Sequence, residues 1–321
     1  MDSTIDALPR VLRELQADGR ESYTRIADRL GMSRRQVTQI VQEAIERGEV
    51  HITASVSPDL LGVECLAYLQ ISVDGPVAPL REALVAMPET SFVSETSGAT
   101  PLDAELRVGA DPHLRATMDR IRALPGVREI QAHLYESIEV NLYSPLRTGR
   151  TTFDVDAADL SIVRALRDDG RASFLELGQA AGISPSGARL RLRRLIAQGA
   201  LKVVGIPLRG KRSGPAPIGI GLSIRGPLDV PLARVRALEP EFLSVTVGEF
   251  DMIAMVTADN TADLLAWMEE VRSIPGVVNT SSWSHLRIAK EQYGHGHSLE
   301  PFTPVGKGAA IWGENPSHDE R

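Results

Sequence analysis

The amino-acid sequence predicts an α+β protein in which a helical unit and a mixed unit each occur twice. The first observation is an ungapped repeat, because residues 11–50 align with residues 162–201 at an offset of 151. The second is the pattern after each repeat, where strand-like and helix-like segments follow the order βαββαβ. The third is the tetrapeptide LPGV at 124–127, which returns as IPGV at 274–277. A chain of 321 residues has room for several domains.

Each helical unit is expected to contain three helices. The first ends at an Asp-Gly-Arg sequence, found at 18–20 and 169–171, and a short second helix follows over 22–30 and 173–181. A glycine turn then leads to a third helix. Three helices in this order predict a winged-helix-like helix-turn-helix. The alternative is an αα-hairpin domain with no role in DNA binding.

The third helix of the second copy, expected over 184–198, has an apolar back and an arginine-rich front. Ser184 is a favourable N-cap residue, and Pro185 suits the first helical position. Helical periodicity turns one stripe inward and the opposite side outward. The inward stripe contains Ala188, Leu192, Leu195 and Ile196. The outward side carries Ser186, Leu190, Arg193 and Arg194, with Arg189 and Arg191 at the flanks. A helix of this kind can pack on a small domain and lie against DNA phosphates.

Each mixed unit is expected to be a ferredoxin-like βαββαβ domain, preceded by one strand at 50–56 and at 201–208. Its segments are 64–73, 77–87, 91–97, 102–108, 112–123 and 127–143 in the first copy. They are 218–224, 229–238, 243–248, 251–257, 261–274 and 277–289 in the second. Because the helices cover one sheet face only, the other face needs a cover. We expect the second copy to supply it, which makes the chain an intramolecular pseudo-dimer.

The same reading divides the chain into five parts. We expect the first helix-turn-helix over 1–58 and the first ferredoxin-like sensing domain over 59–146. The second pair of domains is expected over 154–209 and 214–293, and a flexible tail over 294–321. The Pro- and Gly-containing stretch 144–153 is the expected joint between the halves.

Charge is distributed unevenly along the chain. The net charge is −7, which by itself argues against binding to nucleic acid. Residues 154–212, however, carry 11 Lys/Arg and 6 Asp/Glu, a net charge of +5, whereas residues 1–50 carry 8 and 9, a net charge of −1. The remaining residues therefore carry −11. A basic island in an acidic chain points to a local contact with an anionic partner, and no such island lies in the first copy.

Composition limits the remaining possibilities. The single cysteine, Cys65, excludes an intrachain disulfide and favours a reducing compartment. The acidic N-terminus does not resemble a signal peptide, and no apolar run approaches the length of a membrane span. We therefore expect a cytoplasmic protein that has no contact with membranes. His295 and His297 are too few to predict a metal site, and we expect no cofactor.

The combination of helix-turn-helix, following strand and βαββαβ unit with a closing PGV resembles the Lrp/AsnC (feast/famine) transcriptional regulators. The resemblance covers residues 5–143 and 155–290, so that the whole unit occurs twice. It implies a sequence-specific, DNA-binding transcription regulator that responds to a small effector such as an amino acid. Its implied partners are double-stranded DNA, the effector and further copies of the chain.

The segment VTVGEFD at 245–251 is similar to an element that helps to line a small-molecule site in this family. The resemblance therefore implies that Gly248 and Asp251 bind the effector. The first copy reads GATPLD at 98–103, which places Gly98 and Asp103 five residues apart rather than three. We expect that two inserted residues displace Asp103 and leave one functional site per chain. The alternative is that Asp251 is only a turn carboxylate.

The DNA-binding candidates lie mainly in the second copy. The outward positions of the first copy are Arg35, Gln39, Gln42 and Glu43, and Glu43 opposes phosphate contact where the second copy has Arg194. The alternative for these arginines is a solvated face without a ligand. The full set of candidates is Ser184, Ser186, Arg189, Arg193 and Arg194 in the second copy, with Arg35 and Gln39 in the first.

Two other functions compete with this interpretation. Siroheme decarboxylases have a similar helix-turn-helix plus βαββαβ build and need basic and His side chains to hold the carboxylates of a tetrapyrrole. Here the strand region 243–257 contains no His or Arg, and aromatic residues make up only 4% of the chain. We find no catalytic dyad elsewhere and therefore expect that the protein is not an enzyme. The third possibility is a partner of other regulators that does not itself bind DNA.

Overall fold

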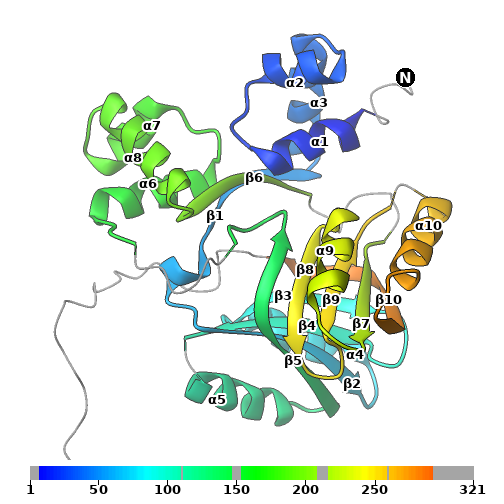
Figure 1. Ribbon diagram of the computed structural model, residues 1–321. Helices are drawn as coiled ribbons and strands as arrows, with labels where there is room; N and C mark the ends of the chain where they lie inside the picture. The colour runs from blue at the N-terminus through cyan, green and yellow to red at the C-terminus, as the bar shows by residue number, and fades with distance from the viewer. Residues whose placement is uncertain (1–6, 110, 147–152, 208–215, 259, 292–321) are drawn as a thin grey trace, which may run out of the picture.

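A computed structural model describes residues 7–109, 111–146, 153–207, 216–258 and 260–291 of the chain. Two three-helix units lie on one side of the molecule, and a large β-sheet assembly flanked by helices lies on the other (Figure 1). The predicted fold class is confirmed, with two winged-helix-like helix-turn-helix units and two ferredoxin-like βαββαβ units. The predicted domain boundaries stay predictions, and the tail with His295 and His297 lies outside the described residues.

The helix-turn-helix units form as their capping residues predict. Gly31 and Gly182 adopt φ of 66° and end the second helix of each unit in the left-handed conformation. One hydrophobic core joins the two units, because the same cluster contains Leu15 and Val37 of the first and Leu166 and Leu195 of the second. The helices are α1 (Leu8–Ala17), α2 (Tyr23–Leu30), α3 (Arg34–Glu46), α6 (Ala157–Asp168), α7 (Phe174–Ala181) and α8 (Pro185–Ala197).

The strand that follows each unit pairs with its counterpart from the other copy. Strands β1 (Val50–Val56) and β6 (Leu201–Pro207) form a two-stranded antiparallel ribbon. Within it, Thr53 lies opposite Val204, and these two residues are equivalent in the repeat at the offset of 151. The pseudo-two-fold axis of the chain therefore passes between them. The short 3-10 helix η1 (Pro58–Leu61) then leads into the barrel.

The two ferredoxin-like units share one closed barrel, in the order β10-β3-β4-β2-β5-β8-β9-β7. The long last strand of each unit crosses to the other unit, so β5 pairs with β8 and β10 with β3. The intramolecular pairing that the sequence predicts is therefore present. The first unit comprises β2 (Cys65–Val73), α4 (Val77–Ala86), β3 (Thr90–Thr96), β4 (Leu102–Val108), α5 (Asp111–Arg122) and β5 (Val127–Asn141). The second comprises β7 (Ile218–Ile224), α9 (Asp229–Ala237), β8 (Phe242–Val247), β9 (Met252–Val256), α10 (Thr261–Arg272) and β10 (Val277–Glu291).

Alternation along the strands separates two kinds of core. In β4, Leu102, Ala104 and Leu106 pack with the helices of the first unit. Asp103 and Glu105 point the other way, into the barrel, where they are nonetheless buried. The interior of the barrel is thus a place where charged side chains are buried. None of the described helices is long and apolar enough to cross a bilayer.

Candidate functional site

Helix α8 presents the exposed face that its sequence predicts. Ser184 accepts a hydrogen bond from the Gly187 amide at 3.1 Å and caps the helix. Ser186 is exposed, and Leu190 is 71% exposed, which places an apolar side chain in solvent on this face. Ala188, Leu192 and Leu195 are buried as expected. Ile196 was wrongly assigned to the inward stripe: it is 44% exposed, because the stripe is one residue narrower than predicted.

The arginines of α8 fall into two groups. Arg193 is exposed, and no ion pair within the described residues engages it. Arg189 is also exposed and lies 5.9 Å from the centre of the Phe174 ring. Arg194, by contrast, forms an ion pair with Asp159, which is buried and also bound by Arg191 at 3.0 Å. The Arg194 guanidinium therefore faces α6. To contact DNA as predicted, it would have to bind a phosphate while it is also paired with Asp159.

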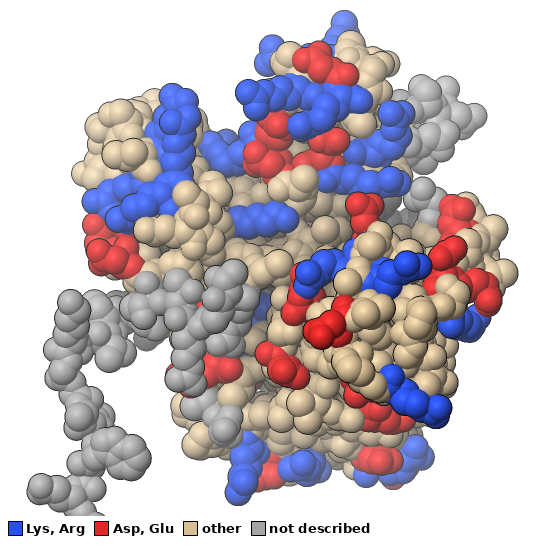
Figure 2. Space-filling model, in the orientation of Figure 1, with Lys and Arg blue, Asp and Glu red and all other residues tan. Residues whose placement is uncertain are grey.

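The corresponding face of α3 has different chemistry. Arg35 is exposed, but the Gln39 amide donates to the Glu43 carboxylate at 2.8 Å. Over the matched residues 8–56 and 159–207, eight Lys/Arg stand against seven Asp/Glu in the first unit and against four in the second. Lys and Arg side chains gather over α7 and α8, whereas over α1 to α3 acidic side chains lie among them (Figure 2). The predicted charge contrast thus persists, although at +1 against +4 it is smaller.

The Asp-Gly-Arg sequences form reciprocal contacts between the two helix-turn-helix units, which we call the clasp (residues 18–21 and 169–172). Arg20 donates to the carbonyls of Gly170 and Ala172 at 2.7 and 2.9 Å. Arg171 donates to the carbonyls of Gly19 and Glu21 at 2.6 and 3.0 Å. The Arg171 guanidinium also lies 4.2 Å from the ring centre of Tyr23, and the Arg20 guanidinium lies 5.3 Å from that of Phe174.

Glycine is needed in the clasp because the backbones approach closely. The Gly19 amide donates to the Val203 carbonyl at 2.9 Å, and the Gly170 amide donates to the Ile52 carbonyl at 2.9 Å. A Cβ atom on Gly170 would lie 2.8 Å from the Ile52 backbone. The clasp therefore ties each unit to the ribbon strand of the other. The repeat revealed these residues in the sequence, but nothing local showed that they meet across 150 positions.

The predicted effector residues lie where β8 joins the other half. Val247 and Gly248 are exposed, and a Cβ atom on Gly248 would meet His133 Nδ1 at 2.7 Å. The Asp251 carboxylate accepts a hydrogen bond from the Ile224 amide at 2.6 Å. One carboxylate oxygen of Asp251 is thus engaged by a backbone amide. The structure brings Gly248 and Asp251 into one loop, and their role in effector binding stays a prediction.

The expected two-residue insertion in the first copy is wrong. The amide of Thr96 donates to the Pro101 carbonyl at 3.0 Å, just as the amide of Thr246 donates to the Asp251 carbonyl at 2.9 Å. The two loops are therefore equal in length, and Pro101 occupies the position of Asp251. Asp103 is not a displaced loop residue but an inward-facing residue of β4. The first copy therefore has a proline where the second copy has the loop carboxylate.

Asp103 belongs to a buried polar chain inside the barrel. Trp283 Nε1 donates to the Tyr68 hydroxyl at 3.0 Å, and that hydroxyl donates to Asp103 Oδ2. The second oxygen of Asp103, Oδ1, has no partner among the described residues. Burial raises the pKa of Asp103 to about 8, although the Tyr68 hydrogen bond opposes the shift. The carboxyl group is therefore protonated at neutral pH.

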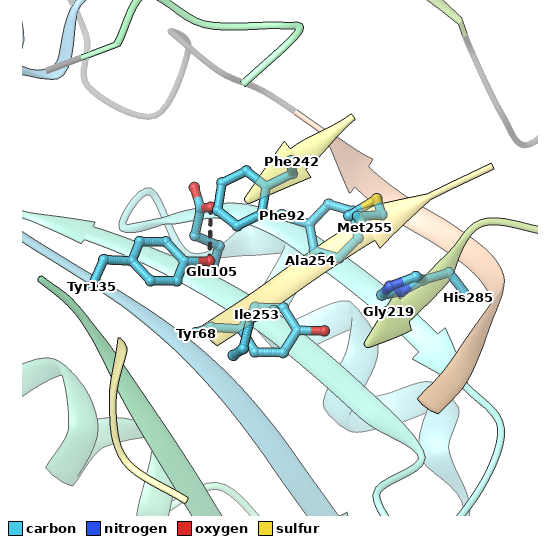
Figure 3. A pocket seen from close by; sticks show the side chains of 10 residues that line it. All are labelled: Tyr68, Phe92, Glu105, Tyr135, Gly219, Phe242, Ile253, Ala254, Met255 and His285. Carbon is cyan, nitrogen blue, oxygen red and sulfur yellow. Dashed lines mark hydrogen bonds between the residues drawn. The ribbon is translucent and has the colours of Figure 1, made fainter. Parts of the chain in front are cut away.

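A second polar cluster lines a small cavity in the same interior (Figure 3). Glu105 accepts from Ser91 Oγ at 2.5 Å, from Arg107 Nε at 2.8 Å and from the Tyr135 hydroxyl at 3.3 Å. His285, from the other half, contacts Ser94 Oγ at 3.0 Å. The cavity leaves about 20 Å³ for the centre of a water molecule, which is enough for little more than one water. The ten lining residues are Tyr68, Phe92, Glu105, Tyr135, Gly219, Phe242, Ile253, Ala254, Met255 and His285.

Sequence reasoning did not identify this interior. The alternation of β4 predicts one polar face, and a polar face on a single sheet normally lies in water. The signal that was available is the expectation that the second copy covers that face, which turns an exposed Asp103 or Glu105 into a buried one. His133 is likewise fully buried, and its ring stacks on Phe250 at 5.2 Å; burial lowers the pKa of His133 to about 4.

Comparisons with known proteins match both halves of the chain. An AsnC-type helix-turn-helix domain is recognised at residues 10–42 and again at 155–196. The HTH-type transcriptional regulator Rv2324 of Mycobacterium tuberculosis is 32% identical over 137 residues, which are 41% of this chain and 91% of that protein. The regulator LysM of Sulfurisphaera tokodaii is 26% identical over 136 residues, which are 42% of this chain and 97% of that protein. Each relative thus corresponds to the length of one half.

A solved structure matches both halves together. It is the siroheme decarboxylase NirDL, in complex with an iron-uroporphyrin III analogue, with a TM-score of 0.58 and 16% identity. The match covers 91% of this chain and 94% of that one. At this identity the likeness shows the fold alone.

The expectation that the protein is not an enzyme is contradicted by this match, because the same full-length architecture occurs in an enzyme. That expectation rested on the absence of His and Arg from residues 243–257, on an aromatic content of 4% and on the lack of a recognisable dyad elsewhere. The structure shows why this test was too narrow: His133, His285 and Arg107 reach the barrel interior from other strands. The absence of His and Arg from one strand pair therefore does not exclude a catalytic site.

The regulators, in contrast, are similar in sequence. Each aligns over 136 or 137 residues, and the helix-turn-helix domain match recurs at the predicted repeat. With an AsnC-type helix-turn-helix in each half and a relative 32% identical along nearly its whole length, the chain belongs to the Lrp/AsnC family of DNA-binding transcriptional regulators.

Proposed function

We propose that the protein binds operator DNA with both recognition helices, which are α3 and α8, the third helix of each helix-turn-helix unit. Of the two, α8 supplies most of the phosphate contact. The observation that carries this proposal is the exposed row Ser186, Arg189, Leu190 and Arg193 on a well-capped helix. An arginine that is exposed and not paired with a neighbouring carboxylate loses little hydration and no ion pair when it binds a phosphate. Arg193 fulfils both conditions within the described residues, whereas Arg194 is already bound to Asp159.

The experiment measures binding to duplexes enriched by the full chain from a random library, across a range of salt concentrations. Arg193→Ala should weaken binding and reduce the salt slope by about 0.9 for each lost phosphate contact. Arg35→Ala in the first copy should reduce the slope less. Gln42→Ala, at the position equivalent to Arg193, is the uncharged control and should leave the slope unchanged.

Two outcomes would contradict the proposal at different levels. Equal losses of slope for Arg193→Ala and Arg35→Ala would refute the dominant role of α8 but leave DNA binding intact. Failure of the wild-type chain to enrich any duplex would refute DNA binding itself.

We further propose that a small amine-bearing effector, such as an amino acid, binds beside the loop 247–251. The loop exposes Val247 next to Leu134 of the other half, and these residues are 62% and 42% exposed. Asp251 offers a carboxylate that can hold an ammonium group while one of its oxygens accepts the Ile224 amide. Because Pro101 replaces this carboxylate in the first copy, the proposal gives one site per chain.

Calorimetry with the common amino acids, one at a time, tests this second proposal. Asp251→Asn removes the charge but keeps an oxygen that can accept a hydrogen bond from the Ile224 amide. The heat of effector binding, and with it the effect of the effector on DNA binding, should therefore disappear, while DNA binding without effector persists. Glu249→Gln is a matched control, because it removes one exposed carboxylate from the same loop. Two binding sites per chain, or an unchanged response in Asp251→Asn, would show that the loop is structural in both copies.

A further inference from the structure

The two recognition helices are related by an axis that is built into one chain. In the ribbon, Val50 lies opposite Pro207, Thr53 opposite Val204, and Val56 opposite Leu201. Because Thr53 and Val204 are equivalent in the repeat, α3 and α8 occupy equivalent places on either side of this axis. Helix-turn-helix proteins with two-fold symmetry read two half-sites in inverted orientation, spaced by about one helical turn of DNA.

The clasp fixes the relative position of the two helices. Arg20 and Arg171 each donate to two carbonyls of the opposite unit, and each lies over an aromatic ring of that unit. The two units also share one hydrophobic core. Separating or rotating them would therefore break charge-assisted hydrogen bonds and expose apolar surface. The spacing of the half-sites is consequently set by the protein and not by a flexible linker.

The two recognition surfaces themselves are chemically different. On α3 the exposed positions are Arg35, Gln39 and Gln42, and on α8 their equivalents are Ser186, Leu190 and Arg193. A glutamine can form a bidentate pair with adenine, whereas a leucine can only make an apolar contact, as with the methyl group of thymine. An arginine prefers guanine. Arg35 is the first of the three exposed positions on α3, whereas Arg193 is the last of the three on α8. Every outward position thus demands a different base or backbone contact in the two halves.

From the rigid two-fold frame and the unequal faces, we infer that the operator is a non-palindromic duplex with two different half-sites at one fixed spacing. This inference rests on the proposed function. A homodimer with one recognition helix per chain selects an inverted repeat, because its two faces are identical. Here a single chain reads one half-site with α3 and a second, different half-site with α8. The chain therefore binds its operator in one orientation only.

The test is selection of duplexes from a random library by the full-length protein, followed by sequencing. The wild type should enrich two unlike half-sites with a constant separation. Changing one base pair in either half-site should weaken binding about 5- to 150-fold. Insertion of about five base pairs, half a helical turn, between them should weaken binding at least as much as replacing one half-site.

A variant that equalises the two faces at four exposed positions, and leaves Arg194 bound to Asp159, makes the test sharper. Ser186→Arg, Arg189→Thr, Leu190→Gln and Arg193→Gln together give α8 the residues that α3 carries at the equivalent positions. All four positions are exposed, so the fold should persist. This variant should enrich an inverted repeat of the α3 half-site. Gln39→Leu alone provides a second, milder variant and should alter only the α3 half-site.

The outcomes separate the inference from the function on which it rests. Enrichment of an inverted repeat by the wild type, or of one half-site alone, would overturn the inference while leaving DNA binding in place. Enrichment of no duplex would overturn the proposed function as well. An unequal operator for the wild type and an inverted repeat for the equalised variant would support the inference.

Discussion

The two halves of the barrel have the same topology but unlike inner surfaces. The first half turns Tyr68 and Gln70 of β2 inward, and the second half has Gly219 and Gly221 of β7 at the equivalent positions. These glycines make room for large rings, because Trp283 lies against Gly219 and Phe250 against Gly221. The charged side chains Asp103, Glu105 and Arg107 of β4 likewise have no charged counterparts on β9.

This difference shows that the inner surface of the first half is complementary to that of the second half and not to a second copy of itself. Two copies of the first half would bury two sets of carboxylates against one another, at a high desolvation cost. In the chain as it stands, Trp283 of the second half donates instead to Tyr68 of the first. The halves have diverged inside the barrel and on the recognition helices, and they have stayed alike at the clasp.

The largest expected effect comes from filling the glycine recesses of the second half. In Gly219→Ala the new Cβ atom would lie 2.3 Å from Trp283 Nε1 and 2.4 Å from its Cε2. We expect a loss of about 3 kcal/mol in the free energy of unfolding, measured by denaturant titration. The loss should shrink when Trp283→Leu is combined with it, because the clash is then relieved. Additive effects in the double variant would contradict this account.

Equivalent substitutions in the two halves of the clasp should have equal effects on the free energy of unfolding, unlike substitutions inside the barrel. Arg20→Ala and Arg171→Ala each remove two hydrogen bonds from a charged group to backbone carbonyls, and each should cost about 2 kcal/mol of unfolding free energy. Because the contacts are reciprocal, the two losses should agree to within about 0.5 kcal/mol. A large loss for one variant alone would show that the pseudo-symmetry of the clasp is only geometric.

The pH dependence of stability should identify the buried carboxyl group of the first half. Burial raises the pKa of Asp103 to about 8, so the folded protein keeps a proton that the unfolded chain releases above pH 4. Stability should therefore fall as pH rises towards 8. Below about pH 6.5 the lowered pKa of His133, about 4, has the opposite effect and masks the fall.

The window from pH 6.5 to 8 is therefore the one to measure. There the Asp103 contribution should be about 1.4 kcal/mol for each pH unit near pH 6.5 and about half of that at pH 8, where the folded carboxyl is half ionised. Asp103→Asn should remove this part of the slope, and His133→Gln should not. A slope that is identical in wild type and Asp103→Asn would show that the carboxyl group is already ionised in the folded protein.

The smallest effect is expected at a pair of exposed isoleucines that the two halves share. Ile45 at the end of α3 and Ile196 at the end of α8 are 45% and 44% exposed. Replacement of either by Ser should change the unfolding free energy by no more than about 0.5 kcal/mol. Leu195→Ala, at the neighbouring buried position, should cost about 2 to 5 kcal/mol by comparison. A large loss for Ile196→Ser would restore it to the inward stripe.

Local patterns predicted the elements well because their causes are local. Helix α8 was expected over 184–198 and runs over Pro185–Ala197, since its cap and its terminal glycine are sequence neighbours. Strand β1 was placed at its observed bounds by the same reasoning. The recognition face needed no more than helical periodicity, and only Ile196 and the orientation of Arg194 depended on packing partners outside the helix.

The interior and the clasp could not be predicted in this way, because their partners lie about 150 residues apart. Nothing near Arg20 shows that it reaches the Gly170 carbonyl. Nothing near Asp103 shows that Trp283 will cover it. The error over the loop insertion has a similar origin: the sequence alone pairs Asp103 with Asp251, and only the hydrogen bonds of Thr96 and Thr246 show that Pro101 is the equivalent residue.

The residues on the pseudo-two-fold axis carry a consequence for how such a protein can change over generations. In a homodimer every codon is expressed twice, and a residue on the axis must be compatible with a copy of itself. Here Thr53 faces Val204. The threonine hydroxyl donates to the Arg167 carbonyl at 2.8 Å, while the valine is fully buried beside Tyr143 and Ile206. A single nucleotide change in this gene alters one side of the axis and leaves the other untouched, so each recognition helix can acquire new base preferences without passing through a state in which both are altered.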